Sequence, residues 1–174
     1  MKVQLVKGDL TKQYVDAIVT PANNKLTIAE GTDSAVHAAA GPELLEACAK
    51  LGGCRTGEAK ITKGYDLAAD YVIHTVGPVW RGGVIGEKAQ LESCYANSMD
   101  LAIQYNLDSI AFPLISVGAN GYPKKDAITV ALSTLLQYKD MDIEISLVLG
   151  NSDAFMLANR IMTQLTQGKS YLKL

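Results

Sequence analysis

Short apolar runs alternate with longer amphipathic stretches along this chain. Residues 2–10 alternate apolar and polar side chains and break at Gly8, a pattern that predicts a strand followed by a turn. Residues 16–23 hold three consecutive apolar side chains before Pro21, which is typical of a buried strand that ends at the proline. Four more runs rich in apolar and β-branched residues predict strands, and they lie within residues 57–65, 70–78, 109–115 and 143–150.

Between these runs the apolar positions take up helical spacing. The clearest helix is predicted over residues 87–106, where Leu91, Tyr95 and Met99 recur on one face. Another is predicted to begin near Asp33, where Thr32 or Asp33 offers an oxygen that caps backbone N–H groups. Further helices are expected from residue 42 to about 50, over 123–137 and over 152–166, and residues 168–174 are expected to form a surface or weakly docked tail.

This order of elements predicts an α/β fold. Strands that are apolar along their whole length, separated by helices, indicate a central mixed, mostly parallel sheet with helices on both faces, which is a three-layer αβα arrangement. No linker, repeat or low-complexity segment interrupts the chain. Residues 1–174 are therefore predicted to form a single domain.

Composition and charge limit the classes of function that this chain is expected to have. The 174 residues are 48% hydrophobic and 20% charged, and the formal net charge is −2, which disfavours nonspecific binding to nucleic acid. No apolar run approaches the roughly 20 residues that span a bilayer, and the first ten residues lack the apolar block of a signal peptide. The three cysteines are odd in number and widely spaced, which favours free thiols in the cytoplasm over a disulfide framework. With only two histidines, a histidine-rich metal site is not expected, and no cofactor is predicted.

Small polar loops follow four of the predicted strands. They are "GDL" after the first strand, "TPANN…GTD" after the second, "SVGANGYP" after residues 109–115, and "GNSDAF" after the last strand. Ligands of open α/β sheets bind at the carboxyl ends of the strands, so these loops are expected to form one cleft. Helix N-termini and free backbone N–H groups in that cleft would favour an anion such as a phosphate.

The loop from Ser116 to Gly121 has the best composition for holding an anion. Its two glycines and one alanine keep side chains away, so that consecutive N–H groups can form a cradle. It is not a P-loop, because no Gly-Lys-Ser/Thr follows, and no G-x-G-x-x-G opens the first helix. A tight turn before the next helix is the alternative interpretation.

Individual polar residues in these loops each allow two interpretations. Asp9 is a candidate acceptor for a base amino group or a turn residue, and Asn23 is a candidate for a sugar hydroxyl or a turn former. Asp33 is a candidate general base or water-positioning carboxylate, or else a helix cap. His37 and His74 lie in apolar surroundings and are interpreted as structural.

The quoted segments, in this order, resemble a macrodomain, the ADP-ribose-binding fold. The likeness is nearest to the MacroD-type branch, whose members remove ADP-ribose from acidic side chains and deacetylate O-acetyl-ADP-ribose. It runs from Val3 to about Ile161 and is densest in "GPELLEACAKLGGCRTGEAKITKGYDLAADYVIHTVGPVW". The segment "SCYANSMDLAIQYNLDSIAFPLIS" agrees as well.

The resemblance implies roles for particular residues. Asp9 would accept a hydrogen bond from the adenine amino group, and the Leu10 amide would donate to the ring. Asn23 would hold the distal ribose, and Asp33 would position or activate water. The phosphate-binding loops would be formed by Gly31 and Thr32 on one side, and on the other by Ser116, Val117, Gly118, Ala119 and Asn120.

This chain departs from the family pattern inside the expected site. Ile28, Ala29 and Glu30 replace glycines of the catalytic loop, so that only Gly31 is kept and a negative charge is added near the expected pyrophosphate. Asn120 replaces the aromatic residue that covers the distal ribose, and Thr20 replaces the first asparagine of the family's "NAAN".

Three hypotheses about function follow. The first is an ADP-ribosyl hydrolase or O-acetyl-ADP-ribose deacetylase that uses Asn23 and Asp33 as catalytic residues. The second is a module that binds ADP-ribose, or a protein that carries it, with little or no turnover. The third is a macrodomain scaffold adapted to a different ligand.

Overall fold

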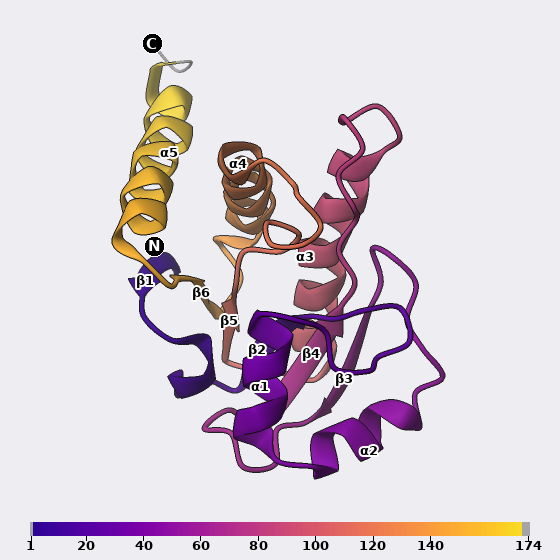
Figure 1. Ribbon diagram of the computed structural model, residues 1–174. Helices are drawn as coiled ribbons and strands as arrows, with labels where there is room; N and C mark the ends of the chain where they lie inside the picture. Colours follow the sequence, from indigo (N-terminus) through magenta and orange to yellow (C-terminus); the bar gives the residue numbers. More distant parts are fainter. Residues whose placement is uncertain (1, 172–174) are drawn as a thin grey trace.

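A mixed sheet of six strands lies at the centre of the molecule (Figure 1). The computed structural model describes residues 2–171, with side chains described as far as Gln167. The strand order is β1-β6-β5-β2-β4-β3; β3 is antiparallel to β4, and the other neighbouring pairs are parallel. This confirms the predicted α/β fold with a mostly parallel sheet. The strands are β1 (Val3–Lys7), β2 (Ala17–Pro21), β3 (Ala59–Lys63), β4 (Tyr71–Thr75), β5 (Ser109–Phe112) and β6 (Glu144–Leu149).

Helices cover both faces of this sheet. Successive strand residues point to opposite faces, so Ile18 and Val72 join one apolar cluster while Val19 and Ile73 join the other. The first cluster is closed by α1 (Thr32–Ala40) and α2 (Glu43–Ala49). The second is closed by α3 (Glu87–Gln104), α4 (Lys124–Leu135) and α5 (Ser152–Tyr171). Two short 3-10 turns, η1 (Leu10–Lys12) and η2 (Leu136–Tyr138), complete the elements.

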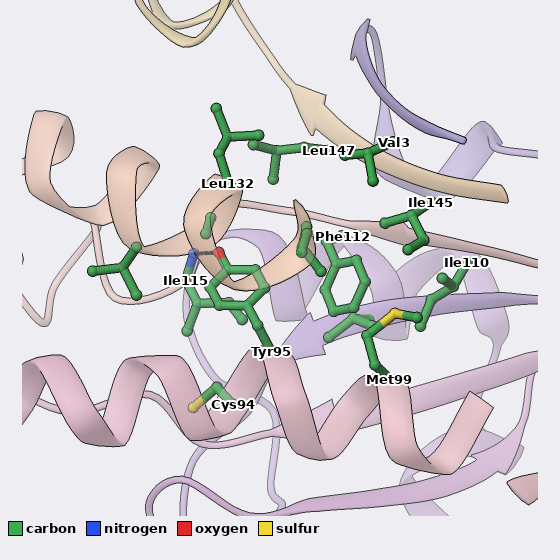
Figure 2. Close-up of a cluster of buried hydrophobic side chains, with 14 of the residues drawn as sticks. Val3, Cys94, Tyr95, Met99, Ile110, Phe112, Ile115, Leu132, Ile145 and Leu147 are labelled. Carbon is green, nitrogen blue, oxygen red and sulfur yellow. Dashed lines mark hydrogen bonds between the residues drawn. The ribbon is translucent and has the colours of Figure 1, made fainter. Parts of the chain in front are cut away.

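Tyr95 links the larger core to a loop at the edge of the sheet. Its ring packs between α3 and β5, with its centroid 5.4 Å from that of Phe112 (Figure 2). Its hydroxyl donates to the carbonyl of Pro113 at 3.1 Å and accepts from the Ile115 amide at 3.3 Å. Burial raises the pKa of this hydroxyl. Tyr95 thereby fixes the backbone that leads from β5 into residues 116–121.

Three local predictions need correction or limits. Neither Thr32 nor Asp33 caps α1, because Gly31 is the N-cap residue and makes no side-chain cap bond. The helix predicted from residue 42 begins at Glu43, with Pro42 as its N-cap. The last helix continues beyond residue 166 to Tyr171, so a helix replaces the first part of the predicted tail, and residues 172–174 lie outside the described part.

Candidate functional site

A cleft of about 560 Å³ lies over the carboxyl ends of β1, β6 and β5. The polar loops that follow these strands line it, together with the first turn of α1, as predicted, whereas residues 22–31 of the polar loop after β2 do not line it. The lining residues come from the loop after β1 (Gly8, Asp9, Leu10, Thr11), from α1 (Thr32, Ala35), from the segment after β5 (Pro113, Leu114, Val117, Lys124) and from the end of β6 with the start of α5 (Val148, Leu149, Gly150, Asn151, Ala154).

Asp9 places a carboxylate on the β1 side of the cleft. Its Oδ1 atom accepts from the Thr11 amide at 2.9 Å and from the Thr11 hydroxyl at 2.7 Å. These bonds lower the pKa of Asp9, so the group is charged at neutral pH. The other oxygen, Oδ2, has no donor among the described residues. Asp9 therefore presents a fixed acceptor to a ligand, and the buried Leu10 side chain anchors the turn beneath it.

Three features in or beside the cleft suit an anion. Thr32 lies in the first turn of α1, where backbone N–H groups lack intrahelical acceptors. Within residues 2–171, no backbone acceptor bonds the N–H groups of Val117, Gly118 or Ala119. Lys124, at the start of α4, is the one basic side chain among the described residues that line the cleft. Together these donors can hold a group such as a pyrophosphate.

The loop formed by residues 116–121 is shaped by its own backbone. Ser116 has a φ of 70°, and its carbonyl accepts from the Tyr122 amide at 2.8 Å, while the Gly121 amide donates to the Gly118 carbonyl. Gly118 and Ala119 are exposed, and of the predicted loop residues only Val117 lines the cleft. Ser116 is buried instead, and its hydroxyl has no partner among the described residues.

Asn120 points away from the cleft. Its side-chain amide donates to the Gly77 carbonyl at 3.2 Å, and its own carbonyl accepts from the Trp80 amide at 2.8 Å. Trp80 packs against Tyr122, with ring centroids 4.7 Å apart, so these two aromatic residues contact each other and do not line the cleft. The loop after β5 is therefore joined directly to the loop after β4.

Asp33 is fully buried and does not line the cleft. Its two oxygens accept from the Thr20 hydroxyl and from the Ala29 amide, each at 2.8 Å. Burial raises the pKa of Asp33, and the bonds from Ala29 and Thr20 oppose that rise. The His37 Nε2 atom lies 3.6 Å from Asp33 Oδ1. In this arrangement both carboxylate oxygens are used to hold the loop before α1 against β2.

Asn23 is likewise engaged with its own loop. Its side-chain amide donates to the Thr27 hydroxyl at 2.8 Å, and its side-chain carbonyl accepts from the Thr27 amide at 3.1 Å. Asn23 is half-buried and does not line the cleft. The structure thus brings Asp9, Leu10, Thr32 and Val117 together around one cavity but leaves both predicted catalytic residues outside it.

The loop before α1 tolerates the loss of its glycines. Gly31 has a φ of 77°, and none of residues 28–30 has a positive φ. The conformation that requires glycine therefore occurs at the one position where glycine is kept. The replacements change surface and charge instead, because Ile28 is 48% exposed and Glu30 is exposed near the N-terminus of α1.

His74 is a buried core residue, as predicted. Its Nε2 atom lies 2.9 Å from the Thr62 hydroxyl, and burial, with the nearby His37, lowers the pKa of His74 to about 4. Cys48, Cys54 and Cys94 are buried free thiols, and burial raises their pKa values. Among the described residues no cluster of three potential metal ligands occurs. No helix in the described range is long and apolar enough to cross a membrane.

The basic side chain in the cleft, Lys124, was not predicted from the sequence. Lys124 follows Pro123 at the start of a predicted helix, and a charged residue in that position is usually part of an exposed helix face. Lys124 lines the cleft only because the fold brings the start of α4 and the end of β6 to the same cavity. Ala35 and Ala154 also line the cleft and were not predicted, because alanine carries no chemical signal of its own.

Comparison with known proteins gives consistent matches. A family model described as the Macro domain matches residues 19–131. A Macro domain-containing protein of Chlorobaculum tepidum is 56% identical over 133 residues, which cover 76% of this chain and 77% of that protein. The ADP-ribose glycohydrolase MACROD2 of Xenopus laevis is 51% identical over 138 residues, which cover 79% of this chain but 33% of that longer protein.

Solved structures agree in fold. The Oceanobacillus iheyensis macrodomain with MES bound has a TM-score of 0.90 and 35% identity, with 94% of this chain and 92% of that chain covered. The Trypanosoma brucei macrodomain in complex with ADP-ribose has a TM-score of 0.84 and 36% identity, with 91% of this chain and 68% of that chain covered.

Proposed function

The chain belongs to the macrodomain family, and we propose that its cleft binds ADP-ribose. The observation that carries the proposal is the lining of the cleft, which combines the Asp9 carboxylate on the β1 side with the unpaired Val117 amide and Lys124 on the side of β5 and α4. An adenine amino group and a pyrophosphate need these two kinds of partner. A related macrodomain, that of Trypanosoma brucei, has been solved in complex with ADP-ribose.

The proposed ligand lies across the strand ends. Its adenine would be at Asp9 and Leu10, after β1, and its pyrophosphate would lie between Val117 and the first turn of α1. The positive charge of Lys124 would offset part of the phosphate charge. Glu30, just before the N-terminus of α1, carries a negative charge that would oppose phosphate binding. From there the distal ribose would extend toward the ends of β2 and β4.

Hydrolysis of ADP-ribosyl esters, whether on acidic side chains or in O-acetyl-ADP-ribose, is the second candidate function. It is favoured by 51% identity to an ADP-ribose glycohydrolase and by the presence of Asn23 and Asp33. For Asp33 to position water, a ligand and a water must reach a carboxylate that is fully buried, lies outside the cleft and already accepts from Thr20 and Ala29. The described arrangement therefore favours binding over turnover.

Two measurements on one preparation test these functions. Isothermal titration with ADP-ribose should give saturable heat with one site per chain. Release of ADP-ribose from a peptide with an ADP-ribosylated glutamate should be slow at saturating enzyme. Fast release that Asp33→Asn abolishes would favour the hydrolase, and an absence of heat would leave only a scaffold adapted to another ligand.

A further inference from the structure

Glu87 holds the loop between β4 and α3 in a fixed shape. Its side chain is buried; Oε2 accepts from the amides of Arg81 and Gly83 at 2.9 and 2.7 Å, and Oε1 accepts from the Ile85 amide at 2.8 Å. Burial disfavours the charged carboxylate, but these bonds outweigh it and lower the pKa of Glu87 to about 2. Residues 79–86 are therefore called the clamped loop.

The clamped loop exposes large apolar side chains. Val79, Val84 and Ile85 are 46%, 84% and 59% exposed. Gly83 adopts a φ of 81°, and a Cβ atom there would lie 2.7 Å from the Trp80 ring, so the turn needs glycine at this position. Apolar side chains that a rigid backbone holds in solvent can be buried by a partner at little cost in loop ordering.

This loop lies beside the open end of the proposed ligand site. The cleft covers the ends of β1, β6 and β5, and next along the sheet come β2 and β4. The clamped loop follows β4 and is joined to residues 116–121 by the bond from the Trp80 amide to the Asn120 carbonyl. In Figure 1 it projects beyond the N-terminal end of α3. A ligand that starts at Asp9 and passes Val117 therefore leaves the cleft toward the clamped loop.

We propose that Val79, Val84 and Ile85 on the clamped loop bind the polypeptide to which ADP-ribose is attached. The proposal rests on ADP-ribose binding in the cleft. A polypeptide joined to the distal ribose would emerge past residues 116–121 and meet these side chains.

The size of the surface favours this occupant over a second copy of the chain. Stable protein interfaces bury at least about 1,000 Å² in total, and three aliphatic side chains supply only a fraction of that area. A polypeptide that ADP-ribose already anchors is present at high effective concentration, so a small apolar contact is sufficient to add affinity.

The test compares two ligands on three proteins. Affinities for free ADP-ribose and for an ADP-ribosylated peptide with apolar flanking residues are measured on the wild type, on the double variant Val84→Ser/Ile85→Ser, and on Met156→Ser. Met156 is the matched control because it is 60% exposed on α5, away from this loop. We expect the double variant to bind the peptide about tenfold more weakly and free ADP-ribose as before, because two aliphatic contacts are lost. We expect Met156→Ser to match the wild type with both ligands.

A second variant tests the role of the clamp. Glu87→Gln should weaken peptide binding without changing affinity for free ADP-ribose, and the loop amides should exchange faster with solvent. Equal peptide affinity for the wild type and the double variant overturns the docking proposal. So does concentration-dependent dimerisation that Val84→Ser/Ile85→Ser abolishes, since the occupant is then a second copy. If the wild type binds no free ADP-ribose, the proposed function itself fails, and the docking proposal with it.

Discussion

The polar groups at the two halves of the sheet's carboxyl edge differ in whether they have hydrogen-bond partners within the protein. Over β1, β6 and β5, Asp9 Oδ2, the Lys124 ammonium and the Val117 amide have no protein partners among the described residues, and their residues line an open cleft. Over β2 and β4, the side chains of Asn23, Asp33 and Glu87 are all bonded to the loops that carry them or lie beside them. The polar groups of the first half are free to bind a ligand, whereas those of the second half stabilise the conformation of the neighbouring loops.

Thr20 is central to this difference. Its hydroxyl is buried in β2 and donates to Asp33, which keeps that carboxylate beneath the loop before α1. Under the proposed function, binding and turnover are separable, because most residues proposed to contact the ligand and the residues proposed to activate water lie in different halves. The predictions below test that separation, beginning with the largest expected effect.

Replacing Asp33 should destabilise the fold more than it weakens binding. In Asp33→Ala the buried Thr20 hydroxyl and the half-buried Ala29 amide lose their acceptor, so the free energy of unfolding should fall by about 3 kcal/mol. Chemical denaturation measures this value, and titration of the folded variant should show an affinity for ADP-ribose within about threefold of the wild type. A stable variant that no longer binds would place Asp33 in the ligand site.

The half of the sheet that contains β2 and β4 should also lose stability in mild acid. The pKa of His74 is lowered from 6.5 to about 4, so as the pH falls below 6.5 the unfolded chain takes up a proton that the folded chain excludes. The free energy of unfolding is therefore highest above pH 6.5 with respect to His74, and it falls by on the order of 3 kcal/mol as the pH is lowered toward 4. The variant His74→Gln should lack this part of the pH dependence in denaturation series. Identical slopes for the two proteins would contradict the assignment.

Filling the cleft over β1, β6 and β5 should strongly weaken the binding of ADP-ribose without affecting the fold. Ala35 is exposed on α1 and lines the cleft, so Ala35→Trp should weaken ADP-ribose binding at least about 100-fold, or ~2.7 kcal/mol. Its stability should stay within about 0.5 kcal/mol of the wild type. Ala38→Trp is the matched control on the same helix, because Ala38 is exposed but does not line the cleft. Equal titrations for both variants would contradict the assignment of the cleft.

Tyr95 supports the loop on the open side from the core. In Tyr95→Phe the Ile115 amide and the Pro113 carbonyl both lose their partner, so stability should fall by about 2 kcal/mol. Thermal unfolding followed by circular dichroism measures the loss. A stability equal to that of the wild type would show that water or a loop shift replaces the hydroxyl.

The smallest expected effect is at the basic side chain of the cleft. Lys124→Ala should weaken ADP-ribose binding about fivefold, or ~1 kcal/mol, and the loss should shrink at high salt. Lys125→Ala is the control, because Lys125 is the next residue on α4 and does not line the cleft. The affinity for adenosine, which lacks phosphate, should not change in either variant. If both lysine variants weaken ADP-ribose binding equally, the effect is a general one of net charge.

The sequence was sufficient for the sheet and its helices because these depend on apolar spacing within each segment. It also placed Asp9, Leu10, Thr32 and Val117 near one another, since strand ends that share an edge must meet. The burial of Asp33 was not predictable, because it depends on Thr20 and on the backbone of Ala29 after folding. For the same reason, the local pattern gave no sign that Glu87 would bind three amides of the preceding loop.

Backbone amide NMR during titration with ADP-ribose tests the central claim most directly. We predict saturable shift changes at Leu10, Thr32, Val117 and Gly118, with small changes at Asn23 and at the Ala29 amide that donates to Asp33. Saturable changes confined to residues outside the cleft, or none at millimolar ligand, would contradict the assignment of this cleft as an ADP-ribose site.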